Sequence, residues 1–375
     1  TVPSGATFVV AGTTEITGAS NVQRPNVKPL IINGDMQVAQ RGTSTASVST
    51  AGFYACDRWN LSLSGTQGVW TITQDTSIPT GEGFAKSTKW DCTTTDASPA
   101  VSDHIKFQQK IEAQDLQLLK YNTASAETMT MSFWVKSNKT GTYILELYNS
   151  DATRQVSKSY TISVADTWEQ KVIVIPSDTG GAINNDNGTG ISCNWFVGAG
   201  TNFTSGTLNT TWAAAVDANR AVGQVNLADS TDNYINFTGV QLEVGEYTSS
   251  TIPPFQFESF GDNLQRCFRY YYKATRDAQD VTIGMTRWYN TTSVGGMFFL
   301  PVPMRANAAI DFNTGSSYWN TSGTNTNNYF DEILFNDGSI THMGWWKGSE
   351  SGTQGDGGIL MTGSASAIGA FDAEL

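Results

Sequence analysis

The sequence predicts an all-β protein built from β-sandwich domains. Apolar and polar residues alternate most clearly in two segments, 31–42 (IINGDMQVAQRG) and 236–245 (NFTGVQLEVG). Because a period of two gives a strand one face for a core and one for water, we expect these segments to be the first and last strands of one sandwich. The 36 glycines and the many aromatic residues also fit sheets joined by tight turns.

The overall charge excludes one class of partner. The chain carries a formal net charge of -12, and only 15% of its residues are charged. Affinity for nucleic acid depends on clustered Lys and Arg, so we expect no nucleic-acid partner. No run of 18 apolar residues occurs and no basic start precedes an apolar core, so we expect neither a membrane span nor a signal peptide.

The four cysteines, Cys56, Cys92, Cys193 and Cys267, are widely separated. This spacing fits neither a disulfide scaffold nor a zinc motif. We expect each to pack as a small hydrophobic residue, with a Cys56–Cys92 bridge as the alternative.

Regular strands separated by turn residues extend along most of the chain. Alternation predicts strands at 30–39, 57–63, 69–74, 85–93, 102–111, 128–137, 141–149, 154–163, 168–175, 191–200 and 234–244, and later at 281–289, 293–302, 308–313, 329–336, 340–346 and 358–361. The best helix candidate spans 259–272, with Ser259 or Asp262 as its cap and Leu264 and Phe268 on one face. It separates the two groups of strands.

Several motifs carry a resemblance. The segment 33–42 (NGDMQVAQRG), then 54–59 (YACDRW), 130–137 (TMSFWVKS) and 239–245 (GVQLEVG) occur in the order and spacing of a jelly-roll domain. This set resembles the jelly rolls, similar to carbohydrate-binding modules, of bacteriophage tail-fibre proteins. The resemblance covers about residues 28–275.

The resemblance implies a division of the chain into four parts. Residues 1–27 resemble the end of a trimeric fibre shaft, in which three glycine-punctuated chains share a core; a disordered polar leader is the alternative. Residues 28–257 would form the jelly roll and 258–275 a helical connector. Residues 276–375, where FFLPVPMRA resembles a strand of the same proteins, would form a C-terminal β-sandwich tip domain.

The function implied by the resemblance is attachment of a phage to its host. We expect a homotrimeric tail-fibre protein of the virion, assembled in the host cytoplasm, which binds host surface polysaccharide or lipopolysaccharide without cleaving it. Its N-terminal side would join other tail or baseplate proteins. The alternatives are a purely structural virion protein, such as a capsid fibre or fibre segment, and a glycan-degrading tailspike or secreted enzyme.

A catalytic site is not evident in the sequence. Neither histidine, His104 or His342, lies beside a nucleophile motif such as G-x-S-x-G. A glycosidase needs two carboxylates across a cleft; Glu258, Asp262, Asp331 and Glu332 lie nearest the expected tip, but turns and caps explain them more simply. We therefore expect no enzyme and no cofactor. The loop 177–190, with Asp178 and Asp186, is a solvated turn or, as the alternative, a structural calcium site.

Sugars stack on aromatic rings and bind hydrogen-bonding side chains, so exposed Trp and Tyr residues indicate binding sites. Our ligand-binding candidates are Trp345, Trp346 and His342, together with Tyr318, Trp319 and Asn320 in an expected loop. Consecutive strand positions alternate sides, so one of Trp345 and Trp346 should face away from the core. Burial of that ring in a trimer interface is an equal alternative. We expect Trp134, Trp168 and Trp195 to be core residues.

Overall fold

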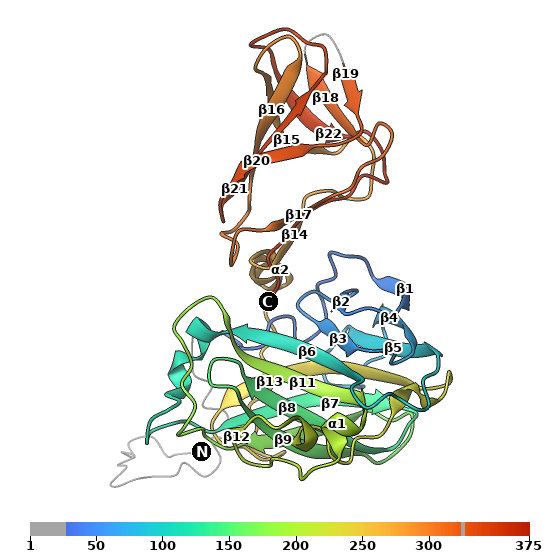
Figure 1. Ribbon diagram of the computed structural model, residues 1–375, viewed down its shortest axis with the longest axis vertical. Coiled ribbons are helices and arrows are strands. Elements are labelled where there is room, and N and C mark those ends of the chain that lie inside the picture. Colours follow the sequence, from blue (N-terminus) through green and yellow to red (C-terminus); the bar gives the residue numbers. More distant parts are fainter. Residues whose placement is uncertain (1–27, 324–326) are drawn as a thin grey trace, which may run out of the picture.

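A computed structural model describes residues 28–323 and 327–375, except the side chains of residues 336 and 337. The chain forms an all-β structure of two stacked units, a broad jelly roll and a narrower distal domain (Figure 1). The predicted all-β fold is confirmed. The expected shaft-like segment, residues 1–27, lies outside the described residues.

The jelly roll consists of two antiparallel sheets packed face to face. The first has the order β1 (Ser44–Val48), β4 (Val69–Asp75), β5 (Ser87–Thr94), β13 (Tyr234–Val244), β7 (Met129–Ser137) and β10 (Glu169–Ile175). The second has the order β12 (Ala213–Ala214), β9 (Arg154–Ile162), β8 (Gly141–Asn149), β11 (Thr189–Ala199), β6 (His104–Glu112), β3 (Asn60–Ser64) and β2 (Gly52–Phe53).

The short helices of the jelly roll lie in its loops. They are α1 (Thr201–Thr204) and the 3₁₀ turns η1 (Ala113–Leu119), η2 (Asp217–Asn219) and η3 (Leu227–Asp229). Within the part of the chain that is described, no helix is long and apolar enough to cross a membrane.

Side chains on the facing sides of the two sheets build the core between them. On β7, Phe133 and Val135 are fully buried, and they face aromatic rings from several other strands. Phe107 of β6 stacks between Trp59 and Phe237, with ring centroids 4.3 and 4.7 Å apart. The four cysteines are all buried and unbridged, as predicted, so no Cys56–Cys92 bridge forms.

The expected strand at Leu30–Ala39 is wrong. The segment is buried but irregular, because the side chain of Asn33 replaces a strand partner. Its amide donates to the carbonyl groups of Val38 and Asp57, both at 2.9 Å, and its Oδ1 accepts from Val38 N. Asn33 and Met36 also have positive φ values of 56° and 60°, which no regular strand contains.

The YACDRW motif has a structural role. Asp57 accepts hydrogen bonds from the backbone and side chain of Gln40, and Trp59 donates to Asn33 O at 2.9 Å. The fully buried guanidinium of Arg58 lies over the ring of Tyr270, 3.4 Å from its centroid. The motif therefore joins the jelly roll to the connector. The strand that we predicted at 57–63 is β3, and it begins only at residue 60, after the motif.

The predicted helix forms in the connector as α2 (Phe260–Phe268), but it ends before residue 272, because residues 271–273 form a strand. Ser259 is the N-cap, because its hydroxyl accepts a hydrogen bond from Asp262 N at 3.1 Å. Cys267 and Tyr270 are buried against Ile32 and Val38 of the jelly roll, with Leu264 at the edge of this small core. The helix is therefore packed onto the first unit.

The distal domain has a large and a small antiparallel sheet. The large sheet has the order β19 (Asn327–Phe330), β18 (Trp319–Gly323), β22 (Gly357–Thr362), β15 (Thr282–Trp288), β16 (Ser293–Phe299), β21 (His342–Gly348) and β20 (Leu334–Gly338). The small sheet has the order β14 (Tyr271–Lys273), β23 (Gly369–Asp372) and β17 (Ala309–Phe312). Two expectations differ here: Trp319 begins a strand instead of lying in a loop, and the strand expected at 329–336 is divided into β19 and β20.

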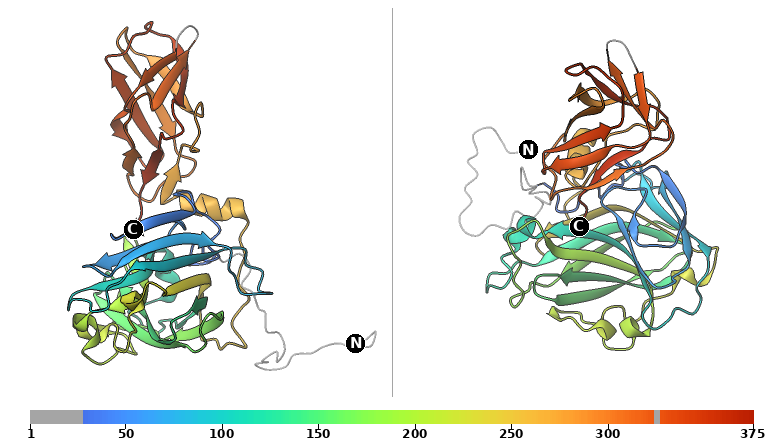
Figure 2. Two further views of the ribbon diagram at one scale, coloured as in Figure 1. Left: turned by 90° about the vertical axis from the view of Figure 1, so that its right-hand side faces the viewer. Right: turned by 45° about the horizontal axis from the view of Figure 1, so that its top comes forward.

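The two units meet where the last residues of the sequence return to the jelly roll (Figure 2). Arg41 pairs with Asp372 at 3.0 Å, and Gln40 donates to Tyr271 O at 2.8 Å. Arg305 of the distal domain donates to Ala373 O and to Asn187 O of the jelly roll, at 2.8 and 3.0 Å. This junction holds the narrow distal domain upright on the sandwich.

Candidate functional site

The sequence-predicted site residues do not form one surface. Trp345 and Trp319 are 1% and 0% exposed and belong to the distal core, and Asn320 is 2% exposed. These three residues are therefore wrong as surface ligand contacts. Tyr318 is half-buried against the same core. Trp346, 38% exposed, faces outward from β21 as the alternation predicted, on the same side as His342.

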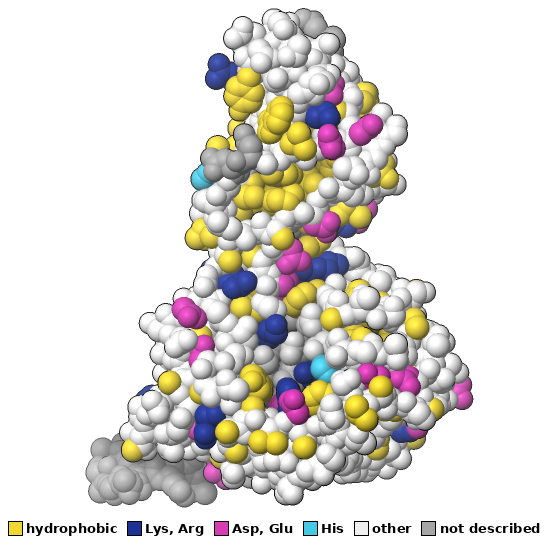
Figure 3. Space-filling model, in the orientation of Figure 1, with side chains coloured by type: hydrophobic (Ala, Val, Ile, Leu, Met, Phe, Trp, Pro, Cys, Tyr) yellow, Lys and Arg dark blue, Asp and Glu magenta, His cyan; other side chains and the backbone are white. Residues whose placement is uncertain are grey.

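Trp346 belongs to an apolar outer face of the distal sheet. Met285 and Met297 are cross-strand partners on β15 and β16, and their side chains are 69% and 42% exposed. Phe299 is 69% exposed opposite His342, and Leu334 lies opposite Trp346. Hydrophobic side chains gather on this domain in Figure 3. An exposed apolar area of this kind marks a contact surface rather than a sugar site.

A better candidate for ligand binding is a groove on the outer face of the first jelly-roll sheet, here called the aromatic groove. It has a volume of about 320 Å³. Its floor consists of Ser132 and Trp134 of β7, Gln170 of β10 and Gln241 of β13. Trp134 is half-buried, so its ring is the floor of the groove and not part of the core, contrary to our expectation. Trp168 is also half-buried, whereas Trp195 is fully buried in the core as expected.

Glycine makes room for the rings on this floor. Gly239 lies in a bulge of β13, where the pairing with β7 shifts between Thr238 and Gln241. Its φ is 60°, and a Cβ there would lie 2.5 Å from the ring of Phe84 and 3.0 Å from that of Trp134. Only glycine lets both rings approach this strand.

The walls of the aromatic groove come from two distant segments. Phe84, Phe255 and Phe257 form a cluster with ring centroids 4.9–5.2 Å apart. Gln241 ties this wall to the floor, because its Nε2 donates to Pro253 O at 2.9 Å. Its Oε1 is buried and has no hydrogen-bond partner among the described residues.

The groove is polar and nearly uncharged. Among the described residues that line it, Glu82 is the one ionisable side chain; the others are hydroxyl, amide, apolar and aromatic groups. Gln170 donates to Ser132 Oγ at 3.4 Å, a long bond that a ligand hydroxyl could replace. An aromatic floor beside amides and hydroxyls suits a neutral sugar.

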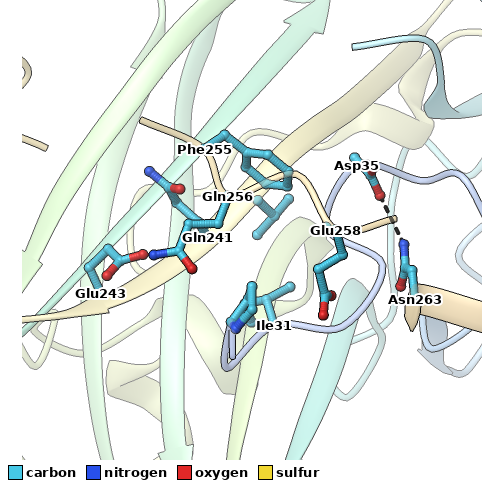
Figure 4. Close-up of a pocket in the computed structure, with 11 residues that line it drawn as sticks. Ile31, Asp35, Gln241, Glu243, Phe255, Gln256, Glu258 and Asn263 are labelled. Carbon is cyan, nitrogen blue, oxygen red and sulfur yellow. Dashed lines mark hydrogen bonds between the residues drawn. The ribbon is translucent and has the colours of Figure 1, made fainter. Parts of the chain in front are cut away.

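A neighbouring pocket between β13 and α2 shares Gln241 and Phe255 with the groove (Figure 4). Its volume of about 10 Å³ holds no more than one water molecule. Asp35 accepts from Asn263 at 3.2 Å, and burial raises the pKa of this carboxyl. Glu258 accepts from Arg266 at 2.5 Å. These acidic groups stabilise the connector and are too enclosed to bind a sugar.

The remaining chemical candidates have structural partners. Burial lowers the pKa of His104 to about 3, and its ring packs edge-on against Phe203. His342 Nδ1 lies 3.0 Å from Ser339 Oγ. In the loop proposed for calcium, Asp178 is held by two bonds from Arg154, at 2.8 and 2.9 Å, and Asp186 accepts from Gly188 N. Within the described ranges, no cluster of three His, Cys, Asp or Glu side chains could hold a metal.

One signal for the groove was present in the sequence. Phe133 and Val135 occupy core positions on either side of Trp134, so a strict period of two directs the Trp134 ring outward. The phenylalanine wall had no comparable signal, because its members come from loops whose positions depend on the whole fold.

Comparisons with known proteins give distant structural likenesses. No protein-family model matches the chain, and no curated protein matches it. Similar solved structures include the enzymatically active domain of tailspike protein 4 of bacteriophage CBA120, at 16% identity and a TM-score of 0.31, over 58% of this chain and 21% of that one. A Bacteroides thetaiotaomicron protein described as sugar-binding is 14% identical, with a TM-score of 0.32, over 58% of this chain and all of that one. A family 61 carbohydrate-binding module in complex with β-1,4-galactotriose is 9% identical, with a TM-score of 0.29, over 58% and 99% of the two chains. Likenesses this distant carry no argument about function.

Proposed function

We propose that this protein is a phage tail-fibre protein of the virion that binds a host surface glycan through the aromatic groove without cleaving it. The observation that carries the proposal is the floor of the groove, where the half-buried ring of Trp134 lies beside the amides of Gln170 and Gln241. The apolar side of a sugar ring would stack on Trp134, and the amides would bond its hydroxyl groups.

A non-catalytic role is consistent with the charges around the groove. Glycoside hydrolysis uses a carboxylic acid and a second carboxylate on either side of the scissile bond. The described lining of the groove supplies the single carboxylate Glu82. Binding without cleavage is therefore the simpler chemistry for this surface.

The apolar outer face of the distal domain supports the proposal of a homotrimer. Met285, Met297, Phe299, Leu334 and Trp346 expose between 36% and 69% of their surface in the single chain. Contact with two further copies would remove these side chains from water, at a gain of about 25 cal/mol for each Å² buried. Three grooves in one trimer would also raise the strength of attachment above that of one weak sugar site. The N-terminal side would join tail or baseplate proteins.

The deciding experiment measures adsorption of the purified protein to intact candidate host cells and to their extracted polysaccharide. We expect Trp134→Ala to weaken binding about tenfold or more, because it removes the stacking surface. Trp168→Ala is the matched control: Trp168 is half-buried beside β10 of the same sheet, where Lys136 Nζ lies 5.6 Å from its ring, and it is outside the groove. Equal binding by wild type and both variants would refute the groove as the attachment site.

The second candidate function is a purely structural virion component, and the apolar outer face favours it, because an exposed apolar area suits contact between protein chains. Sedimentation gives the oligomeric state, and together with adsorption it distinguishes the two candidate functions. Trimers that adsorb to no host material would support the structural role. A monomer at micromolar concentration would contradict the homotrimer, and release of reducing sugar from host polysaccharide would contradict non-catalytic binding.

A further inference from the structure

The distal domain contains a second polar cavity, here called the tip pocket. It lies beside the large sheet of this domain, where β15 and β18 end and β22 begins, and it has a volume of about 250 Å³. Figure 1 shows β18 at the end of the domain remote from the jelly roll. Thr286, Trp288 and Thr321 line it from the strands, and residues 351–353 line it from a loop.

Two hydroxyl groups of the tip pocket lack partners. Thr286 and Thr321 are 7% and 2% exposed, and neither Oγ1 has a hydrogen-bond partner among the described residues. Other buried threonines of the chain are satisfied: Thr362 Oγ1 donates to Ala278 O at 2.6 Å and Thr238 Oγ1 to Lys86 O at 2.7 Å. Since leaving a buried hydroxyl unpaired is costly, two such groups in one cavity indicate a ligand that completes them.

The strand register places glycines, and no side chain, beside Thr286 on the neighbouring strands. Gly358 pairs with Thr286 on one side and with Gly323 on the other, so two glycines follow Thr286 across one face of the sheet. A Cβ at Gly358 would lie 3.0 Å from Thr286 Oγ1 and 2.6 Å from Ser322 O. Any side chain at this position would occupy the space in front of the hydroxyl.

The outer boundary of the pocket is formed around an indole ring. Gly352 lies so close to Trp288 that a Cβ there would be 2.3 Å from the ring, so the loop is packed directly on the indole. Asp356 is the one charged residue in the described lining, which contains no Lys, Arg or His. The pocket therefore suits a neutral ligand that has both hydroxyl groups and an apolar side.

We propose that the tip pocket binds one neutral sugar residue. Two of its hydroxyl groups would pair with Thr286 and Thr321, and its apolar side would lie against Trp288. This site is separate from the aromatic groove and does not depend on it, because the two lie in different units of the chain.

The test is saturation-transfer NMR with the full chain and separate solutions of D-glucose, D-galactose and N-acetyl-D-glucosamine. Glycerol and N-acetylneuraminic acid serve as the small-polyol and anionic probes. We expect transfer to at least one neutral sugar and a loss of affinity of about tenfold in Thr286→Val/Thr321→Val, since each valine removes a hydrogen bond at nearly constant volume. The melting temperature of the free double variant should rise, because the unpaired hydroxyls are gone.

Two further variants keep the result interpretable. Thr282→Val, at an exposed position of the same strand outside the pocket, should bind as the wild type does. Gly323→Ala adds a methyl group that meets only Gly357 O, at 3.4 Å, so this variant should fold and should bind the sugar more weakly. It replaces the double variant in the test if the double variant does not fold. Trp134→Ala should leave this binding unchanged, which separates the tip pocket from the aromatic groove.

Three results would overturn the proposal. The first is no transfer to any neutral sugar by the folded wild type. The second is transfer that persists unchanged in the double valine variant or, if that variant does not fold, in Gly323→Ala. The third is stronger binding of glycerol or N-acetylneuraminic acid than of every neutral sugar.

Discussion

Replacing Glu374 with glutamine should destabilise the junction between the two units. The carboxylate of Glu374 is 5% exposed and pairs with the guanidinium of Arg58, which is 1% exposed. Arg58 also donates to Lys110 O at 2.8 Å and lies over Tyr270. Arg41 reaches the same carboxylate at 3.4 Å. One acidic group thus balances two largely buried cations.

The size of the effect follows from this burial. Removing one member of a buried ion pair costs about 3–5 kcal/mol, because the other charge stays desolvated and uncompensated. Arg58 has no second carboxylate within ion-pair distance in the described structure, whereas Arg41 retains Asp372 at 3.0 Å. We therefore expect Glu374→Gln to lower the free energy of unfolding by about 3–5 kcal/mol. That is a large fraction of the stability of an ordinary domain.

Urea-induced unfolding, followed by tryptophan fluorescence, measures this change. Glu127→Gln is the control, because Glu127 pairs with Lys120 at 2.6 Å with side chains 38% and 54% exposed, and exposed pairs contribute about 1 kcal/mol or less. Arg58→Met/Glu374→Leu should recover much of the loss, since no buried charge is then left unpaired. A Glu374→Gln loss no larger than that of Glu127→Gln would refute the reasoning.

Two further changes test the interior of the jelly roll. Lys106 is 6% exposed and burial lowers its pKa to about 8, so between pH 8 and 10.5 the unfolded chain holds more of the proton at this residue, and the contribution of Lys106 to stability rises with pH. Lys106→Met should stabilise the protein at pH 7 by about 2 kcal/mol, and this gain over the wild type should shrink as the pH rises above 8; a difference in urea unfolding between variant and wild type that does not change with pH would contradict this. Gly34→Ala should destabilise by about 1–3 kcal/mol, because its Cβ would lie 2.1 Å from Val240 O. Gly261→Ala, with nothing within 4 Å on helix α2, should not lower the melting temperature.

Much of the fold follows from local pattern. The strands predicted at 141–149 and 234–244 match β8 and β13 residue for residue, because turn residues bound each of them at both ends. The helix after Ser259 also follows from its cap. The segment 30–39 misled the prediction, because its residues 31–36 are all buried in an irregular chain that the side chain of Asn33 holds in place.

The sites depend on information that a single sequence does not contain. Trp345 and Trp346 were correctly expected on opposite sides of a strand, but the exposed ring of Trp346 lies in a wide apolar face instead of a polar groove. The aromatic groove combines β7 with residues from 82–84 and 249–257. The tip pocket depends on which glycine lies opposite Thr286, and strand register is fixed only by the complete sheet.

The position of β13 determines when the jelly roll can fold. This strand lies in the middle of the first sheet, between β5 and β7, although it is the last strand of the jelly roll along the chain. Its partners, which begin at Ser87 and Met129, are separated from it by about a hundred residues or more. During synthesis the sheet therefore remains open down its centre, with two unpaired strand edges, until residue 244 has left the ribosome. Contacts this distant in sequence make folding slow, and the open edges are exposed to pairing with neighbouring chains throughout that interval.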